Sequence, residues 1–148
     1  MSIFTSAIGC LRLWRRERTV DKREITKSLA IELDNLAELM SELLLVTEAD
    51  GQIKQEKLEE LEILRQRVWS GWVTILGTSG YASQDPELQA EIEKCISIAH
   101  AAPGAYVEEL YLAQIGMAKG RISHEVRGRF AKSIHNIQDL TTRMRLNA

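Results

Sequence analysis

The sequence is poor in the residues that end helices or cross-link small folds. It holds only 2 prolines and 9 glycines among 148 residues, which favours long uninterrupted helices over a turn-rich β protein. The two cysteines, Cys10 and Cys95, are far apart and outside any Cys-x-x-Cys spacing. This argues against a disulfide framework or zinc site and indicates a reducing, cytoplasmic location. We expect Cys95 to act as a small apolar core residue.

Long apolar runs are also missing. The longest uncharged stretch, residues 68–84, is interrupted by three glycines and by several Ser and Thr residues. It is shorter and more polar than the roughly 20 apolar residues of a transmembrane helix. At the start of the chain, the positive charges follow the apolar residues, which reverses the order of a secretory signal. We therefore expect neither a membrane span nor export.

The charge is nearly balanced overall but unevenly distributed. The net charge is −2, which predicts nothing about partners. Residues 1–30 carry seven Lys/Arg against three Asp/Glu, residues 31–63 two against ten, and residues 113–148 seven against two. In an even-numbered bundle the two ends lie together, and the molecule then has a basic and an acidic flank. The alternative is that these charges are ordinary solvated helix faces.

Helical periodicity begins at residue 19 and continues to the end of the chain. Leu29, Leu36 and Leu43 repeat at seven, which predicts a first long helix from residue 19 to a stop at residues 48–51, closed by a left-handed Gly51. A second helix is expected from about residues 53–55 through Ile75, ending in the glycine cluster of residues 77–80.

Three further helical segments follow. Asp85-Pro86-Glu87 predicts an N-capped third helix, which Pro103 breaks or bends. The next piece covers residues 106–118 and ends at Gly120, and Ser123 caps a last helix that runs to residue 144. The predicted fold is all-α: an antiparallel up-and-down bundle of four to five helices over residues 19–148, preceded by a short amphipathic helix in residues 1–18. The heptad stripe serves this bundle or a homo-oligomer seam equally well.

The residue patterns of common catalytic and metal sites do not occur. A di-iron bundle needs Glu-x-x-His pairs, and none precedes His100, His124 or His135. Residues 77–81 resemble Gly-x-Ser-x-Gly, but Tyr81 replaces the last glycine and no strand precedes it. Phosphate-binding glycine loops are absent from the sequence. The interpretation is a non-enzymatic protein without a cofactor or metal.

Trp69 and Trp72, with Arg65 and Arg67 nearby, form the densest aromatic group. We interpret this group as a core anchor with one partly exposed ring. The alternative interpretation is a binding hot spot, since Trp, Tyr and Arg are enriched there.

The N-terminal segment, residues 1–18, carries the strongest functional signal. Apolar anchors recur at helical spacing and arginines crowd the end of the segment: Phe4, Ile8, Leu11 and Trp14, with Arg12, Arg15, Arg16 and Arg18. Such a segment docks on a partner protein or lies on a membrane surface, where an acylated Cys10 would add a second anchor. The alternative is that it caps its own bundle. We expect an interaction, scaffold or regulatory protein, cytoplasmic or peripheral at a membrane.

The basic C-terminal helix supports a different function. It would track phosphates as a small subunit of a nucleoprotein complex. Against this reading, the chain is not basic overall and no aromatic platform accompanies the cluster. The nucleic-acid-binding candidates are Arg121, Arg127, Arg129, Lys132, Arg143 and Arg145.

Overall fold

The computed structural model describes residues 22–116 and 120–146, and these residues form an all-helical bundle. The α-helices are α2 (Lys22–Leu44), α3 (Leu58–Thr78), α4 (Pro86–Ala99), α5 (Ala102–Gln114) and α6 (His124–Leu146). Two 3-10 turns, η1 (Gln55–Lys57) and η2 (Ser79–Tyr81), flank α3. The described residues contain no strand, only two isolated bridges. The expected helix in residues 1–18 lies outside the described residues.

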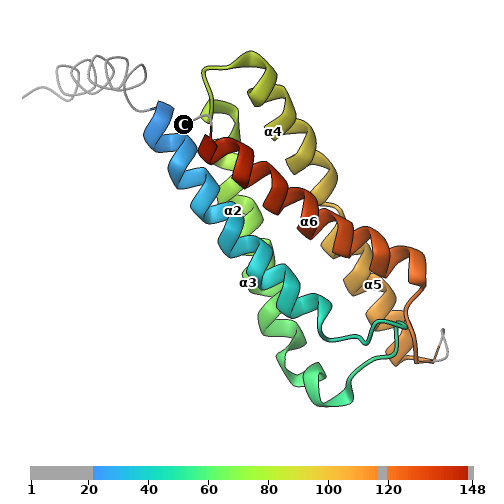
Figure 1. Ribbon diagram of the computed structural model, residues 1–148. Coiled ribbons are helices and arrows are strands. Elements are labelled where there is room, and N and C mark those ends of the chain that lie inside the picture. The colour runs from blue at the N-terminus through green and yellow to red at the C-terminus, as the bar shows by residue number, and fades with distance from the viewer. Residues whose placement is uncertain (1–21, 117–119, 147–148) are drawn as a thin grey trace, which may run out of the picture.

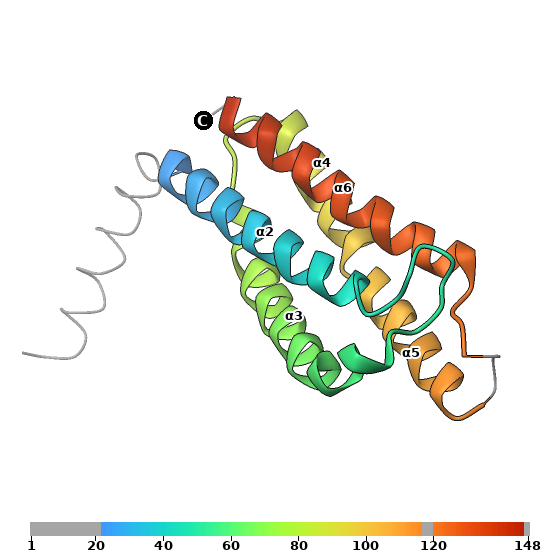
Figure 2. The ribbon, with the colours of Figure 1, turned by 60° about the horizontal axis from the view of Figure 1, so that its bottom comes forward.

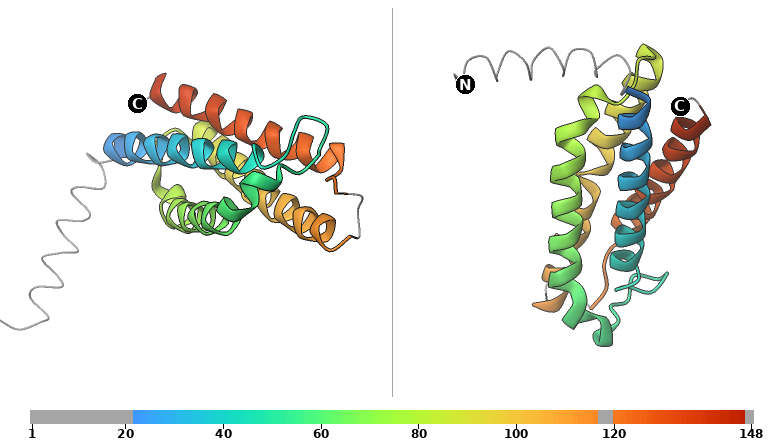
Figure 3. Two further views of the ribbon diagram at one scale, coloured as in Figure 1. Left: turned by 90° about the horizontal axis from the view of Figure 1, so that it is seen from below. Right: turned by 90° about the vertical axis from the view of Figure 1, so that its left-hand side faces the viewer.

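The chain runs up and down four rods, because α4 and α5 follow one another as a single interrupted rod (Figure 1). This arrangement confirms the antiparallel bundle. Helix α2 packs mainly against α6 and α3, while α6 also packs along α4 and α5. In Figure 2 and in both views of Figure 3, α3 and α6 lie on opposite sides of α2. The contact between α3 and α5 is slight, so this side of the bundle is the least closed.

The core follows the apolar periodicity of the sequence. The α2 stripe that contains Leu29, Leu36 and Leu43 is fully buried, as a face enclosed by neighbouring helices requires. From the opposite side of the bundle, Tyr106 of α5 stacks on Phe130 of α6 with ring centroids 4.6 Å apart. The half-buried Cys95 packs against the core, and burial raises its thiol pKa.

The helix starts that the sequence marks most clearly are confirmed. The Asp85 carboxylate accepts a hydrogen bond from the backbone N–H of Glu87, and Pro86 occupies the first turn of α4. Ser123 Oγ accepts from the backbone N–H of Val126 at the start of α6. Pro103 lies in the first turn of α5, just after the break between α4 and α5, where a missing N–H costs no helical hydrogen bond.

Two helix ends differ from the prediction. Helix α2 stops at Leu44, before the expected residues 48–51, and α5 stops at Gln114, before residue 118. Gly51 has the expected positive φ of 88° but lies in the loop rather than at a helix end. Gly116, with a φ of 84°, follows α5 instead of Gly120. Two helix starts differ as well: α3 begins later than expected, at Leu58, because η1 occupies residues 55–57, and α5 begins earlier, at Ala102 rather than at residue 106.

Gly51 joins the α2–α3 loop to the segment before α6. Its carbonyl accepts from Ile122 N at 2.9 Å, and Ile53 N donates to Gly120 O at 3.3 Å. A Cβ at position 51 would lie 2.4 Å from the carbonyl oxygen of Ile122. Only glycine permits both the left-handed backbone and this close approach. The glycine is therefore required by the contact of its backbone with that of Ile122, far away in the sequence, and not by the end of a helix.

Candidate functional site: the groove between α3 and α5

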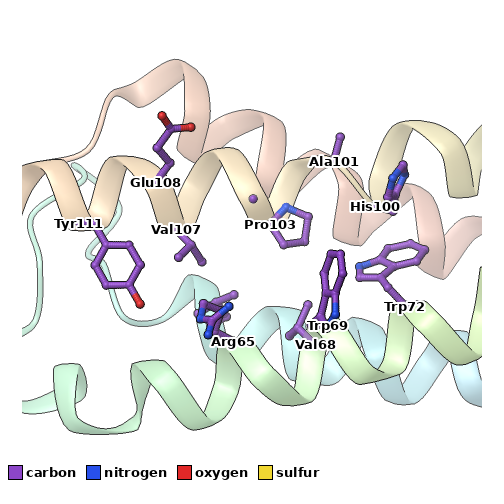
Figure 4. Close-up of a pocket in the computed structure, with 12 residues that line it drawn as sticks. Arg65, Val68, Trp69, Trp72, His100, Ala101, Pro103, Val107, Glu108 and Tyr111 are labelled. Carbon is purple, nitrogen blue, oxygen red and sulfur yellow. The ribbon is translucent and has the colours of Figure 1, made fainter.

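An apolar groove of about 550 Å³ lies between α3 and α5, next to the junction with α4. Figure 4 shows α3 side chains facing those of α5 across it. We name it the α3–α5 groove. It is lined by Leu43, Arg65, Val68, Trp69, Trp72, His100, Ala101, Pro103, Gly104, Val107, Glu108 and Tyr111.

The helical repeat of α3 leaves this side open. Its buried residues, Leu61, Leu64, Val68, Trp72 and Ile75, recur at three and four and face the core. Trp69, Val73 and Leu76 lie on an adjacent strip of the helix surface and are exposed. Across the groove, α5 presents Gly104, whose added Cβ would meet nothing within 4 Å. The missing side chain adds to the space between the helices.

Trp69 and Trp72 occupy different environments three residues apart. Trp72 is 2% exposed, whereas Trp69 is 66% exposed. This confirms the interpretation of a core anchor beside a partly exposed ring. Among the described residues, Trp72 Nε1 is the only buried side-chain nitrogen or oxygen without a hydrogen-bond partner. In Figure 4 the nitrogen edge of its ring is turned toward Trp69 and Pro103.

His100 closes the end of the groove next to Trp72. The two rings meet edge to face with centroids 6.1 Å apart. Its Nδ1 lies 3.0 Å from the carbonyl oxygen of Ser97. Because a carbonyl oxygen only accepts, Nδ1 is the donor in this bond. The hydrogen bond therefore anchors the imidazole against the indole.

A polar bridge crosses the other end of the groove. Tyr111 on α5 donates its hydroxyl hydrogen to Glu62 Oε2 on α3 at 3.0 Å. Arg65 binds the same carboxylate through Nε, at 3.1 Å, and through Nη2. These hydrogen bonds, first that of Arg65 and then that of Tyr111, lower the Glu62 pKa to about 2. Glu62 therefore stays ionised, and the bridge persists, well into the acidic range.

The groove offers apolar contact and a few polar groups. Within residues 22–116 and 120–146, no His, Cys, Asp and Glu side chains gather in a group that would hold a metal ion. The described helices also include none that is long and apolar enough to cross a membrane. Recognition of an apolar surface is the chemistry that this lining supports.

The residues predicted to contact a partner or membrane all lie outside the described residues. They are Phe4, Ile8, Leu11, Trp14, Arg12, Arg15, Arg16 and Arg18. Cys10 lies outside them as well. The basic candidates in and before the last helix are described, and most of them bond to side chains or backbone of the bundle.

The six basic candidates do not form one face. Arg127 and Arg145 point toward the α2 side, where Arg127 Nε donates to Thr47 Oγ1 at 3.0 Å and Arg145 pairs with Asp34. Arg143 lies on the α4 side, with Nη1 2.5 Å from Glu91 Oε2. The others are Arg129, paired with Glu125; Arg121, 3.9 Å from Asp50; and the exposed Lys132.

Arg129 and Lys132 line a second hollow, of about 390 Å³, between α6 and the α4–α5 junction. Its other lining residues include Ile98, Ala102 and Val126. A surface that binds the phosphate backbone of a nucleic acid presents several adjacent cations. This hollow is instead lined in part by apolar residues. The structure thus separates the basic residues that the sequence places on one helix.

Comparison with protein-family models, with curated proteins and with solved structures gave no match to this chain. Sequence reasoning found Trp69 and Trp72 but missed the groove, because more than half of its lining comes from α5 and the two residues before it. Two features of the sequence could have indicated it. The apolar residues of α3 cover more than one face of the helix, and Gly104 leaves room on α5.

Proposed function

We propose that this protein is a non-enzymatic interaction protein that assembles by docking residues 1–18 into the α3–α5 groove of a second copy. The observation that carries the proposal is the exposed apolar strip of Trp69, Val73 and Leu76 beside an open groove. Amphipathic helices bind such grooves through anchors spaced three and four residues apart. Exposed Trp with nearby Tyr and Arg is typical of binding hot spots.

Residues 1–18 have dimensions that suit the groove. Their anchors run from Phe4 to Trp14, about 15 Å along a helix at 1.5 Å per residue. The α3 residues that line the groove run from Arg65 to Trp72, and the exposed strip beside it continues to Leu76. Together they rise about 17 Å by the same measure. The four anchors are therefore about as long as the groove and the exposed strip taken together.

Charge favours docking between two copies. Glu62 accepts the Tyr111 hydrogen bond at one end of the groove, and Glu108 lies near Tyr111 and away from Trp72 (Figure 4). Helix α2 begins at the opposite end, since Thr26 Oγ1 donates to Ala82 O just after α3. A segment docked in its own groove would keep residues 12–18 near that opposite end. A second copy permits the reverse direction, which brings the arginines to the carboxylates.

The experiment compares full-length variants by analytical ultracentrifugation. Gly104→Leu fills the groove from α5, and Gly128→Leu makes the same change on an exposed position of α6 with open space around it. Both replace a helical glycine, so neither should weaken its helix. We expect the wild type and Gly128→Leu to dimerise and Gly104→Leu to remain monomeric. Leu11→Asp, which breaks the anchor series, should also be monomeric.

A labelled peptide of residues 1–18 then separates the two halves of the interaction. It should bind Leu11→Asp, which retains its groove, and fail to bind Gly104→Leu. A wild type that stays monomeric and does not bind the peptide contradicts the proposal. Vesicle co-sedimentation that is lost in Leu11→Asp but retained in Gly104→Leu would instead assign residues 1–18 to a membrane surface.

The nucleic-acid alternative has less support, because its basic residues are divided between two sides of α6 and mostly paired. It expects affinity for nucleic acid that falls steeply with salt and that decreases when Arg127 and Arg129 become Ala. Absence of binding at low salt would exclude it.

A further inference from the structure

We propose that the Trp72 end of the α3–α5 groove binds a small apolar molecule that carries an uncharged hydrogen-bond acceptor, such as a ketone or amide carbonyl. The acceptor would take the hydrogen bond of Trp72 Nε1–H. Trp72 is 2% exposed and its nitrogen has no partner among the described residues, although the ring lines the groove. This inference rests on Trp72 and does not require the docking of residues 1–18.

The indole nitrogen needs an acceptor. An indole N–H only donates, and a buried donor left without a partner is a recognised cost to a folded protein. Buried Trp side chains usually find a partner for this reason. Among the described residues none accepts this hydrogen bond, and His100, whose ring lies 6.1 Å from the indole between centroids, does not accept it either. A bound carbonyl oxygen would complete the pairing.

The surroundings select an apolar body for the ligand. Trp69, Val68, Pro103 and Val107 line the space beside Trp72. The whole groove, of which this space is one end, has a volume of about 550 Å³ and lies in the range of about 300–1,000 Å³ that holds small-molecule ligands. One buried polar group in an otherwise apolar pocket is the usual arrangement for fixing a ligand's orientation.

The charges around the groove disfavour an anion. Arg65 is paired with Glu62, and the lining also contains the exposed carboxylate of Glu108. A carboxylate ligand would therefore lack a free arginine and would meet negative side chains at the rim. An uncharged acceptor has no such repulsion.

Trp69 controls access to the indole nitrogen. Its ring is 66% exposed and lies beside the nitrogen edge of Trp72 (Figure 4). Exposed side chains change rotamer on the picosecond to nanosecond scale. Rotation of Trp69 toward solvent would bring Trp72 Nε1 into contact with a ligand without movement of a helix.

The test titrates the full-length Leu11→Asp variant, whose groove is left open by the loss of docking, with benzophenone and with diphenylmethane, which has the same two rings but no carbonyl. The indole N–H signals of the three tryptophans are followed by ¹H–¹⁵N NMR and assigned from Trp→Phe variants. Both probes should perturb the Trp69 signal. Only benzophenone should move the Trp72 indole proton downfield, as a new hydrogen bond requires.

The variant Trp72→Phe keeps an aromatic ring and removes the donor. It should weaken benzophenone binding about fivefold, which is the effect of losing one hydrogen bond, and leave diphenylmethane binding unchanged. Gly104→Leu should abolish binding of both probes, and Gly128→Leu should not. Thermal unfolding by circular dichroism establishes that each variant is folded.

Three results would overturn the inference: no binding of either probe, a Trp72 signal that benzophenone leaves in place, or equal weakening of both probes by Trp72→Phe. The NMR titration of Leu11→Asp keeps Trp72, so a misfolded Trp72→Phe leaves the inference testable. Peptide docking is measured separately. Because Trp72 presents almost no surface, Trp72→Phe should not change the affinity for residues 1–18.

Discussion

The guanidinium of Arg127 on α6 donates a hydrogen bond from Nε to Thr47 Oγ1, 3.0 Å away and 80 residues earlier in the chain. Its Nη2 lies 3.4 Å from the carbonyl oxygen of the same residue. Thr47 is fully buried, and its hydroxyl also lies 2.9 Å from Tyr106 Oη. The sequence predicts Arg127 to be a surface cation, but in the structure it connects α6 to the segment after α2.

Arg127→Ala should therefore destabilise the fold, whereas Arg129→Ala should not. Loss of the hydrogen bonds from the Arg127 guanidinium is expected to lower the free energy of unfolding by about 1–3 kcal/mol. Arg129 is exposed and pairs only with Glu125 one turn away, so its removal should cost under about 0.5 kcal/mol. Urea unfolding measures both, and equal effects would show that Arg127 has no structural role.

Tyr106 should make stability fall at alkaline pH. Burial raises its pKa to about 12, above the value near 10 of an unfolded chain. Between these pH values the unfolded chain loses its phenolic proton before the folded protein does, so the folded state loses stability as pH rises. The contribution is complete below pH 10 and amounts to about 3 kcal/mol, because a pKa difference of one corresponds to about 1.4 kcal/mol. Between pH 10 and 12 the free energy of unfolding, measured by urea unfolding, should fall more steeply with pH for the wild type than for Tyr106→Phe. An equal fall in both proteins would contradict the prediction.

Gly51→Ala should be much more harmful than Gly116→Ala. Both glycines have positive φ, but only the Cβ at position 51 would meet a backbone oxygen, at 2.4 Å. The left-handed backbone alone costs about 1 kcal/mol for alanine, and this is the expected effect at position 116. At position 51 the loop must also move away from Ile122, and we expect a loss of about 3 kcal/mol. Thermal unfolding of the two variants gives the comparison.

Trp72→Ala should cost about 3–5 kcal/mol, as truncation of a buried aromatic side chain does. Trp69→Ala should change the free energy of unfolding by less than about 1 kcal/mol, because its ring is mostly in solvent. Chemical denaturation distinguishes the two. Similar losses would mean that Trp69 is part of the core.

The sequence predicts the bundle well where local chemistry decides the outcome. The stripe of Leu29, Leu36 and Leu43 is buried, and Asp85 and Ser123 begin helices as their side chains indicate. The end of α2 is different, because the loop containing Gly51 is held by Ile122 from the far end of the chain. No local pattern reveals such a partner.

The site is predictable only in part for the same reason. One buried and one exposed tryptophan follow from the helical positions of Trp72 and Trp69. The space between them and α5 depends on how closely two helices approach, which Gly104 and the break between α4 and α5 influence. The structural role of Arg127 was not predictable either, because its partner Thr47 is 80 residues away in the sequence and comes near only on folding.

The slight contact between α3 and α5 has a dynamic consequence. Helix α3 is held mainly by α2 along one side, and the Tyr111–Glu62 hydrogen bond is exposed to water. Swinging of α3 about α2 would therefore expose less apolar area than separation of α2 from α6. Amide hydrogens of α3 should exchange with solvent deuterium sooner than those of α2 and α6, through an opening that leaves the remaining helices assembled.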